Sequence, residues 1–559
     1  MSKRKGMILP LVAAAMIICC GGEREVTVIA GTETTPAQAG RGMVSSAHPL
    51  ATRAGIEILK AGGNAFDAAV AVAAALNVVE PMMSGVGGYG TILVYDAKGR
   101  KVRFLDSSGR VPAALNSDVF RAPTPGYEEN RRGPKAVSTP GNVNAWEAMS
   151  KEYGKLEWPR LFDSAIRLAG EGFTVSEGLA GAIRSAFDGF PERAKAFYGK
   201  NGAPLNAGDP LIQKDLAATL SAIAEGGARA FYQEEIAASV DREMQSSGGF
   251  LSKADLAADK AEWWEPVHIN YRDHDVYTAS PPATAFPSLI RLGLMSRFDA
   301  QKLGHNSTAY LHVFAEVTKH AFWCRLAYAG DPGVKPPPLE RLLSEAYWKE
   351  EAAKIDLDKT RPFSPPGLPP AEDSHTTHFV VADRWGNLVS ATQTLGNAFG
   401  SRIMPEGTGV WLNNSLAYCT FEPKGNPMDA HAGRRKLSGD CPTIIIKNGK
   451  PWAALGTPGG HTIGQTVPQM VLNLIDFGMN IQEALAAPFI SFAEPDFLMV
   501  ERRIPQSVRD ELAALGHNVR AVGGLTNAHG VTIEYDEEGR PLRFYGGTDP
   551  RGEGLASGY

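Results

Sequence analysis

The hydrophobic pattern of the chain changes from helical spacing near its start to strand-like alternation near its end. The segment 65–79, AFDAAVAVAAALNVV, is apolar on nearly every side, which indicates a helix buried in a core. A helical pattern over about 49–61 precedes it and stops at Gly62-Gly63, and Asn64 is a favourable N-cap for the buried helix. These two helices are therefore predicted to be core elements.

Strand–turn–strand units predict hairpins, because each joins two β-prone runs through a short turn that contains glycine. The units cover residues 91–105, 378–394, 442–456 and 530–546. The segment 461–478 has a helical pattern, and the middle of the chain, from 158 to about 357, is predicted to be mostly helical. Strands and buried helices come from both halves of the chain, which favours one shared sheet core covered by helices over two separate domains.

The N-terminus has the pattern of a secretory signal, with three basic residues before the apolar run 7–18 and small residues after it. We predict a signal peptide over 1–22 and an exported protein, periplasmic or membrane-anchored. The apolar run is too short to span a bilayer, so no transmembrane span is expected in the mature protein. Cys19 or Cys20 is a candidate for a lipid anchor, and simple cleavage at the glycines that follow is the alternative.

Composition narrows the function classes only slightly. The 559 residues carry a formal net charge of −5, which gives no composition-level case for binding nucleic acid or an anionic membrane. Three cysteines lie beyond the signal, an odd number that is no disulfide framework, although one Cys419–Cys441 bridge is conceivable. Residues 23–40 are predicted to be a linker and the Pro-rich stretch 361–373 an exposed loop.

Two motifs have simple alternatives to a cofactor or metal role. Gly85–Gly90 matches GxGxxG, but a helix precedes it and a strand follows, the reverse of a dinucleotide site. We therefore interpret it as a Gly-rich corner where backbones approach closely, near an active site. His375 and His378 flank Thr376 but lack an obvious third metal ligand nearby. The sequence predicts neither a metal nor a cofactor.

Two further segments have chemical potential that the residues alone leave open. Thr376 starts a strand after the Pro-rich loop, which is unremarkable by itself. Gly459 and Gly460 lie between a strand and a helix, where free backbone N–H groups can hold an anion. Such a segment suits an oxyanion hole, and a plain strand-to-helix turn is the alternative.

Seven stretches in this order resemble the γ-glutamyltranspeptidase (γ-glutamyltransferase, glutathione hydrolase) family of N-terminal-nucleophile hydrolases. They are AHPLATRAGIEILKAGGNAFDAAVAVAAALNVVEP (47–81), SGVGGYG (84–90), LEWPRLFDSAIRLAGEGF (156–173), TTHFVVADRWGN (376–387), GTGVWLNN (407–414), GTPGG (456–460) and the terminal TDPR…SGY. The resemblance extends from about Gly42 to Tyr559, nearly the whole mature chain.

The resemblance implies an α+β fold, a four-layer αββα sandwich made as one precursor. The precursor is expected to cut itself between His375 and Thr376. This yields a large subunit, 41–375, and a small subunit, 376–559, which remain together as a heterodimer and form one domain. No cofactor is implied.

The resemblance also implies the roles of the catalytic residues. Thr376 is expected to be the nucleophile, with its freed α-amino group as the base. Thr394 is at the position of the family threonine that supports the nucleophile, and Gly459 and Gly460 are at the oxyanion positions. An α-amine has a reference pKa of about 7.7–8.0, so it accepts a proton near neutral pH without the large pKa shift that a lysine would need.

The chain departs from the family at the positions that read the amino-acid head of the donor. Ser108 replaces the arginine that holds the α-carboxylate, and Tyr418 replaces the aspartate that holds the α-amino group. Arg110, two residues after Ser108, is a candidate substitute. The remaining substrate positions that the resemblance places are Gly396 with the adjacent Asn397, Ser415, Ser438 and Gly439.

Three readings follow. The first is an exported, self-processing Thr amidohydrolase or acyltransferase that cleaves γ-glutamyl or related acyl amides and transfers the acyl group to water or an amine. The second is an acylase or small-amide hydrolase of the same family, cephalosporin-acylase-like, without γ-glutamyl specificity. The third is a non-catalytic exported binding protein with this fold. Loss of two charged contacts to the donor head favours amide chemistry over glutathione specificity.

Overall fold

Two large antiparallel sheets form the centre of the computed structural model, which describes residues 29–121, 127–363, 375–493 and 496–559. The predicted signal peptide and its cysteines lie outside the described residues, as does most of the Pro-rich stretch. The first sheet has the order β1 (Ala37–Ala39), β20 (Pro541–Thr548), β19 (His529–Tyr535), β15 (Lys450–Gly456), β14 (Thr443–Lys447), β11 (His274–Thr278), β10 (Val267–Tyr271). The second has the order β21 (Leu555–Gly558), β2 (Gly42–Ser46), β12 (His375–Asp383), β13 (Leu388–Gly396), β3 (Tyr89–Asp96), β4 (Lys101–Ser107), β9 (Glu262–Trp264).

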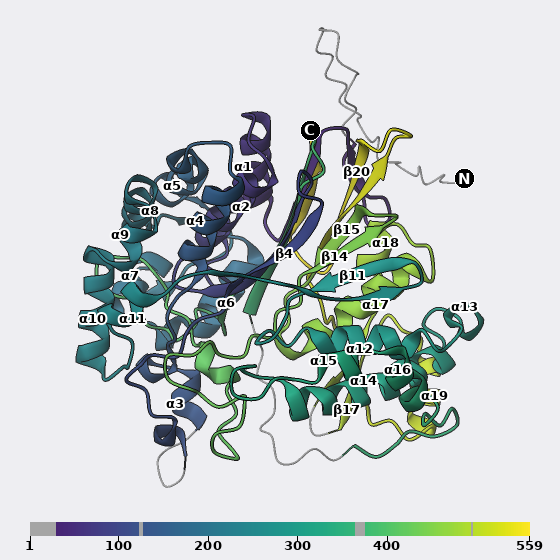
Figure 1. Cartoon of the computed structure of the whole chain (residues 1–559). Coiled ribbons are helices and arrows are strands. Elements are labelled where there is room, and N and C mark those ends of the chain that lie inside the picture. Colours follow the sequence, from purple (N-terminus) through teal and green to yellow (C-terminus); the bar gives the residue numbers. More distant parts are fainter. Residues whose placement is uncertain (1–28, 122–126, 364–374, 494–495) are drawn as a thin grey trace, which may run out of the picture.

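The sheets pack face to face and helices cover their outer faces, which gives the αββα sandwich (Figure 1). The helices on the side of the second sheet include α1 (Pro49–Lys60), α2 (Ala65–Val79), α4 (Asn142–Tyr153), α5 (Asp163–Glu171), α8 (Lys214–Gly226) and α9 (Ala228–Tyr232). Those on the side of the first sheet include α12 (Phe286–Met295), α14 (Thr308–Tyr328), α16 (Glu345–Ala352), α17 (Ile463–Ile475), α18 (Ile481–Ala486) and α19 (Gln506–Ala514).

Smaller elements connect these layers. The helices are α3 (Tyr127–Arg131), α6 (Glu177–Ala186), α7 (Glu192–Tyr198), α10 (Glu235–Ser247), α11 (Lys253–Ala258), α13 (Ala300–Leu303) and α15 (Leu339–Leu342). A small sheet contains β16 (Ile490–Ala493), β17 (Phe497–Glu501) and β18 (Val519–Val522), and two short pairs are β5 (Phe173–Thr174) with β8 (Pro210–Leu211) and β6 (Gly199–Lys200) with β7 (Ala203–Pro204).

The buried helix α2 is joined to the end of strand β12 by one carboxylate. Asn64 and Asp67 form a capping box at the start of α2, as the N-cap prediction required. Asp383, the last residue of β12, accepts a hydrogen bond from the Ala65 N–H at 2.8 Å. Asp383 also accepts the backbone N–H and the side-chain amide of Asn387, which fixes the β12–β13 turn. Helix and hairpin are therefore positioned together.

Most predicted elements are confirmed, and the structure differs from the sequence analysis or adds to it at three places. The four hairpins are β3–β4, β12–β13, β14–β15 and β19–β20, and strands from both sides of residue 376 share each sheet. The segment predicted as a linker, 23–40, contributes β1, which pairs with β20 at the sheet edge. The middle of the chain is mostly helical, as predicted, and also contains the short strands β9, β10 and β11. Cys419 and Cys441 are free, buried thiols.

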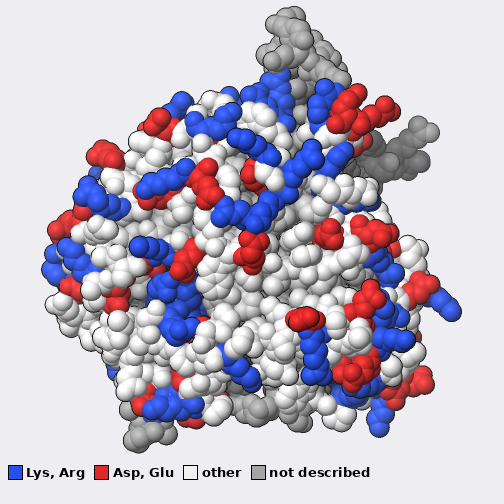
Figure 2. Space-filling view, viewed as in Figure 1, with Lys and Arg blue, Asp and Glu red and all other residues white. Residues whose placement is uncertain are grey.

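The surface gives no sign of a uniformly charged face in the view of Figure 2, where acidic and basic side chains are interspersed. This agrees with the small net charge of the sequence. Among the described residues, no helix is both long enough and apolar enough to cross a membrane.

Replacement of Asp383 by alanine should lower the free energy of unfolding by about 2–4 kcal/mol, because several buried N–H donors lose a charged acceptor. Denaturant unfolding measures this loss. Asp536→Ala is the matched control, since Asp536 has a similar place in the β19–β20 turn but is only partly buried. Equal losses in the two variants would contradict the role of Asp383 as the link between α2 and β12.

Candidate active site

A row of side chains crosses the second sheet on the face that looks toward the first sheet. In the ladders, Thr376 of β12 is opposite Thr394 of β13, and Thr394 is opposite Tyr89 of β3. Directly opposed residues project to the same face, so these three side chains lie side by side. A register shift between His375 and Thr376 leaves Leu395 as an extra residue on β13. This irregularity marks the point where the row begins.

The Thr394 hydroxyl connects the two residues of the expected cleavage bond. Thr376 Oγ1 donates to Thr394 Oγ1 at 3.1 Å, and Thr394 Oγ1 donates to the carbonyl oxygen of His375 at 2.8 Å. The Gly396 N–H donates to the same hydroxyl at 2.7 Å. Thr376 and Thr394 are 3% and 2% exposed, so these bonds are shielded from water. The arrangement places the Thr376 hydroxyl next to a peptide carbonyl that already accepts a hydrogen bond.

The Gly-rich corner 85–90 packs directly against this row. A Cβ on Gly88 would lie 2.5 Å from the carbonyl oxygen of Thr394, and one on Gly90 would lie 2.5 Å from that of Thr392. A side chain at either position would therefore collide with the backbone of β13. The structure confirms a close backbone approach, with a helix before the corner and a strand after it.

Close contact between the sheets positions the segment that contains Gly459 and Gly460. Gly456, the last residue of β15, packs on the ring of His378, where a Cβ would lie 2.4 Å from Cε1. His378 is two residues after Thr376 on β12 and shares its face. The chain leaving β15 at Gly456 therefore enters the Gly459-Gly460 turn beside the nucleophile row.

The Gly459-Gly460 turn has the geometry that glycine permits. Gly459 has φ = 132° and Gly460 has φ = 56°, and a Cβ on Gly459 would lie 2.3 Å from Thr462 Oγ1. Gly460 begins a 3₁₀ turn, Gly460–Thr462, that continues into α17. Within the described residues neither glycine N–H donates a hydrogen bond, so both are available to an anion.

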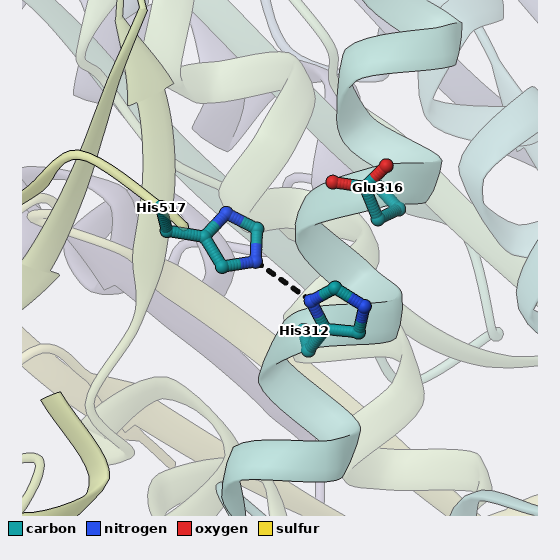
Figure 3. A group of neighbouring side chains, drawn as sticks. All are labelled: His312, Glu316 and His517. Atoms are coloured by element: carbon teal, nitrogen blue, oxygen red, sulfur yellow. Dashed lines mark hydrogen bonds between the residues drawn. The ribbon is translucent and has the colours of Figure 1, made fainter. Parts of the chain in front are cut away.

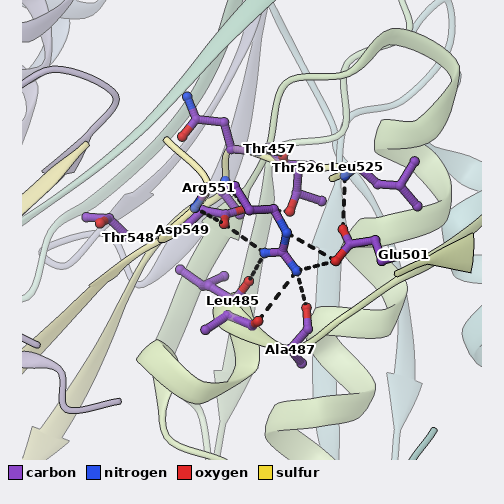
Figure 4. A network of polar contacts seen from close by, with 12 residues as sticks. Thr457, Leu485, Ala487, Glu501, Leu525, Thr526, Thr548, Asp549 and Arg551 are labelled. Atoms are coloured by element: carbon purple, nitrogen blue, oxygen red, sulfur yellow. Dashed lines mark hydrogen bonds and ion pairs between the residues drawn. The ribbon is translucent and has the colours of Figure 1, made fainter. Parts of the chain in front are cut away.

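An ionic network near the C-terminus holds the loop around residues 525–527, which contacts the glycine turn (Figure 4). Arg551 donates to Glu501 Oε2 at 2.7 Å and to Asp549 Oδ1 at 2.7 Å, and it also reaches backbone carbonyls such as that of Ala487. Glu501 Oε1 in turn accepts the Leu525 N–H at 2.9 Å. Breaking ion pairs between buried charges is costly, so Arg551 of the terminal TDPR motif, through Glu501, holds the backbone of Leu525 in place.

The loop that follows Leu525 contacts both ends of the glycine turn. Thr462 Oγ1 donates to the carbonyl oxygens of Gly459 at 2.9 Å and of Leu525 at 3.4 Å. The Asn527 N–H donates to Thr457 Oγ1 at 3.2 Å. The glycine turn is therefore held both by Thr462 within it and by the neighbouring loop 525–527.

Ser108 and Arg110 are placed differently from one another. Ser108 is fully buried, and among the described residues its hydroxyl has no hydrogen-bond partner. Its carbonyl accepts a hydrogen bond from Arg435 at 2.6 Å. Arg110 is partly exposed and forms ion pairs with Glu262 at 2.9 Å and with Asp259 at 3.9 Å. The guanidinium of Arg110 is therefore committed to these carboxylates.

Gly396, Asn397 and Ser415 are joined through two buried asparagines. Asn414 Oδ1 accepts the Asn397 N–H at 2.8 Å and would lie 2.1 Å from a Cβ on Gly396. Gly396 also has φ = 100°, so glycine is required there. Asn413 Oδ1 accepts the Ser415 N–H at 3.1 Å. The structure therefore brings all three substrate candidates next to the end of β13.

Tyr418, Ser438 and Gly439 lie by the glycine turn. The rings of Tyr418 and His461 have centroids 6.2 Å apart, and a Cβ on Gly439 would lie 3.6 Å from the carbonyl oxygen of Gly460. Ser438 Oγ donates to Asp440 Oδ2 at 2.7 Å. Each residue that the sequence proposed for substrate contact is thus near the row or the turn, with Arg110 directed to an ion pair instead.

Sequence analysis missed Glu80, Lys436 and Asp440. Glu80 Oε2 accepts a hydrogen bond from the hydroxyl of Thr377 at 3.0 Å, and burial raises the pKa of Glu80 to about 7. Lys436 and Asp440 flank the Ser438-Gly439 pair in KLSGD, two opposite charges four residues apart that directly follow Arg434 and Arg435. That pattern was the available signal.

A histidine–glutamate group on the far side of the first sheet is the one set of potential metal ligands among the described residues (Figure 3). His312 Nδ1 and His517 Nε2 already share a hydrogen bond of 2.8 Å. Lys319 lies 3.5 Å from the Glu316 carboxylate and Arg361 lies 3.3 Å from it. Two cations beside the only anionic ligand oppose a metal ion, so we interpret the group as a structural polar cluster.

Comparisons with known proteins match nearly the whole chain. A family model described as Gamma-glutamyltranspeptidase matches residues 51–559. The glutathione hydrolase proenzyme of Escherichia coli K12 is 36% identical, over 94% of this chain and 93% of its own. The acylase ACY 1 proenzyme of Pseudomonas sp. V22 is 35% identical, over 88% and 90%. The crystal structure of cephalosporin acylase from Bacillus halodurans superposes with a TM-score of 0.85 at 30% identity, covering 98% and 99%.

The raised pKa of Glu80 predicts a pH-dependent cost to stability. A carboxyl whose folded pKa of about 7 exceeds its unfolded value of 4.5 binds more protons when folded, so its contribution falls as pH rises from about 4.5 to about 7. Glu80→Gln should therefore raise the free energy of unfolding above pH 7 by at most about 3 kcal/mol, compared with the chain that keeps Glu80. Near pH 4.5 the gain should be small.

The measurement is denaturant unfolding at several pH values in a Thr376→Ala background, which is expected to remain a single chain. Glu345→Gln, an exposed helix glutamate, is the control. A Glu80→Gln gain that does not vary with pH would show that the carboxyl does not titrate in this range.

Proposed function

Because the chain belongs to the gamma-glutamyltranspeptidase family, we propose that it is a self-processing amidohydrolase and acyltransferase with Thr376 as its nucleophile. The observation that carries the proposal is the pair of hydrogen bonds that joins Thr376 to Thr394 and Thr394 to the carbonyl of His375. A hydroxyl aimed at its own preceding peptide bond is the geometry that self-cleavage needs.

Self-cleavage uses the residues already in contact. The Thr376 hydroxyl adds to the carbonyl carbon of His375, while the Thr394 hydroxyl donates to the oxygen that becomes negative. The C–N bond then breaks, the nitrogen takes the hydroxyl proton, and an ester joins the two residues. Water hydrolyses this ester, leaving a carboxylate on His375 and a free α-amino group on Thr376. The large subunit, 41–375, and the small subunit, 376–559, stay together because strands of both pair with one another in each sheet, as β11 does with β14 and β2 with β12.

The freed amino group then acts as the base during turnover. It accepts the proton of the Thr376 hydroxyl as the oxygen attacks an amide carbonyl, and it donates a proton to the leaving amine. The N–H groups of Gly459 and Gly460 stabilise the oxyanion of the tetrahedral intermediate. The acyl group rests on Thr376 as an ester until water or an acceptor amine takes it. Thr394 keeps the hydroxyl oriented throughout.

The substrate is an amide with a short acyl group, either γ-glutamyl or a related acyl chain. One similar protein is a glutathione hydrolase proenzyme and another is an acylase proenzyme, so both substrate types are represented among the relatives. The acylase type is favoured by Ser108 and Tyr418, which occupy the positions that bind the donor's α-carboxylate and α-amino group in the family. Neither side chain supplies a charge for an amino-acid head. We propose export to the periplasm, with a lipid anchor at Cys19 or Cys20 as the finer alternative.

Cleavage between His375 and Thr376 is the first prediction of this function. Wild type should give two bands on a denaturing gel, the smaller of about 20 kDa and starting at Thr376, while Thr376→Ala should stay a single inactive chain. Thr394→Val should slow cleavage at least about tenfold, because the carbonyl of His375 loses its hydrogen-bond donor.

Thr377→Val is the matched control for cleavage, since Thr377 lies next to the nucleophile but bonds to Glu80 on the opposite face of β12. It should still be processed. A small fragment whose first residue is not Thr376 would show that the nucleophile is misassigned.

The α-amine as base predicts a pH dependence of kcat/KM. The rate should rise through an apparent pKa near, or somewhat below, the free-amine value of about 7.7–8.0, because only the neutral amine accepts a proton. Steady-state kinetics with an anilide substrate over about pH 5–9 measures this. A flat profile, with single-turnover data showing that chemistry limits the rate, is incompatible with an amine base.

A further inference from the structure

A cleft lies at the end of the sandwich opposite to Thr376. Strand β12 continues from Thr376 to Asp383 at about 3.3 Å per residue, so its far end lies about 23 Å from the proposed nucleophile. The four hairpin turns β3–β4, β12–β13, β14–β15 and β19–β20 meet there, at the end where the C-terminus lies (top of Figure 1). The cleft between them has a volume of about 320 Å³, which is in the range of small-molecule sites. No step of the proposed reaction uses it.

Hydrogen bonds join the turns of each sheet into one wall of the cleft. The Ala97 N–H donates to Asn387 Oδ1 at 2.9 Å, which connects the β3–β4 and β12–β13 turns. The Tyr535 hydroxyl donates to the carbonyl oxygen of Pro451 at 2.6 Å, which connects the β19–β20 and β14–β15 turns. The cleft is therefore formed by the fold itself, with one wall from each sheet.

Glycines in the turns keep the cleft open. Gly539 has φ = 82°, and a Cβ there would lie 2.6 Å from Lys450 Nζ. Gly386 has φ = 88°, and a Cβ there would lie 3.3 Å from Cγ of Pro541, where turns of the two sheets meet. Both glycines line the cleft, so a side chain at either position would narrow it and displace its neighbours.

Three aromatic side chains, Tyr95, Trp385 and Tyr535, line the cleft. Trp385 is 37% exposed, although tryptophan is highly buried on average. Two cations contact its ring: Lys155 Nζ lies 3.9 Å from the ring centroid, and the guanidinium carbon of Arg384 lies 4.5 Å from it. These contacts hold the indole in place at the surface. Rigid aromatic faces of this kind suit a ligand that carries a flat ring.

The charge of the lining is positive. Arg100 and Lys450 line the cleft, and among the described lining residues there is no aspartate or glutamate. The nearby cations Lys101 and Arg540 are paired with carboxylates. By contrast, no ion pair within 4.0 Å joins Arg100 or Lys450 to a carboxylate in the part of the chain that the structure describes. Two cations without a compensating anion favour a negatively charged ligand.

We propose that this cleft binds a small oxyanion that carries a flat ring, the class represented by aryl phosphates. The ring packs against the aromatic side chains, and Arg100 and Lys450 bind the negative oxygens. Tyr95 and Arg100 belong to the proposed large subunit and the other lining residues named here to the small one, so a bound anion contacts both. The site does not depend on the proposed function, because Thr376 takes no part in it.

Isothermal titration calorimetry of the wild-type protein with 2-naphthyl phosphate, inorganic phosphate and 2-naphthol tests the site. The first compound should bind at least about tenfold more tightly than either of the others, because it alone combines the ring with the charge. Arg100→Gln and Lys450→Met should each weaken this binding about tenfold or more. Lys98→Gln is the matched control, since Lys98 is in the same turn as Arg100 but does not line the cleft, and it should change the Kd less than about threefold.

Two outcomes would overturn the site: equal binding of the three compounds, or binding of 2-naphthyl phosphate that Arg100→Gln and Lys450→Met both leave intact. Kinetics exclude binding at the active site. Both variants should keep the wild-type kcat/KM on an acyl anilide, because the cleft is about 23 Å from Thr376. Competitive inhibition of anilide hydrolysis by 2-naphthyl phosphate, with an inhibition constant equal to its Kd, would place the probe at the active site and overturn the proposal. Absence of self-cleavage in the wild type would contradict the proposed function alone.

Discussion

The close approach of the two sheets at His378 and Gly456 is the contact on which the active-site geometry depends. The missing Cβ of Gly456 lets the ring of His378, in the second sheet, pack on the end of β15 in the first. That contact sets the distance between the strand that bears Thr376 and the strand that leads to Gly459. Thr376, the proposed nucleophile, and the candidate oxyanion donors come from different sheets, so a shift of one sheet against the other would separate them. Rigid packing on both outer faces opposes such a shift.

Many polar groups around this contact have hydrogen-bond or ion-pair partners, and some buried ones do not. Arg551, Glu501 and Asp549 exchange charge-assisted bonds that hold the loop beside the glycine turn. Thr394 accepts two hydrogen bonds and donates one. Among the described residues, buried polar atoms of this region that lack a hydrogen-bond partner include Lys436 Nζ, Ser108 Oγ, Thr91 Oγ1 and Asp106 Oδ2. The Thr394 hydroxyl is therefore fully hydrogen-bonded, whereas the N–H groups of Gly459 and Gly460 have no partner among the described residues.

Sequence reasoning predicted the elements whose pattern is local. The helix over 65–79 and the four hairpins were readable because periodicity and glycine turns are properties of neighbouring residues. The edge strands β1 and β9 were not, since strands of three residues exist only through their pairing partners. Gly459 and Gly460 were candidates from their place between a strand and a helix, and the family resemblance assigned their role and that of Thr376. Lys436 escaped because its meaning depends on which carboxylates stand near it, and that is a property of the fold.

The central claim is that Thr376, at the start of a processed fragment, holds the acyl group during turnover. Acid quenching of the enzyme during hydrolysis of an acyl anilide, followed by peptide mapping with mass spectrometry, tests it directly. The account predicts the mass of the acyl group on the peptide that begins with Thr376, and none on the same peptide after the substrate is exhausted. An acyl group on another residue, or turnover with no acylated peptide at any quench time, would contradict it.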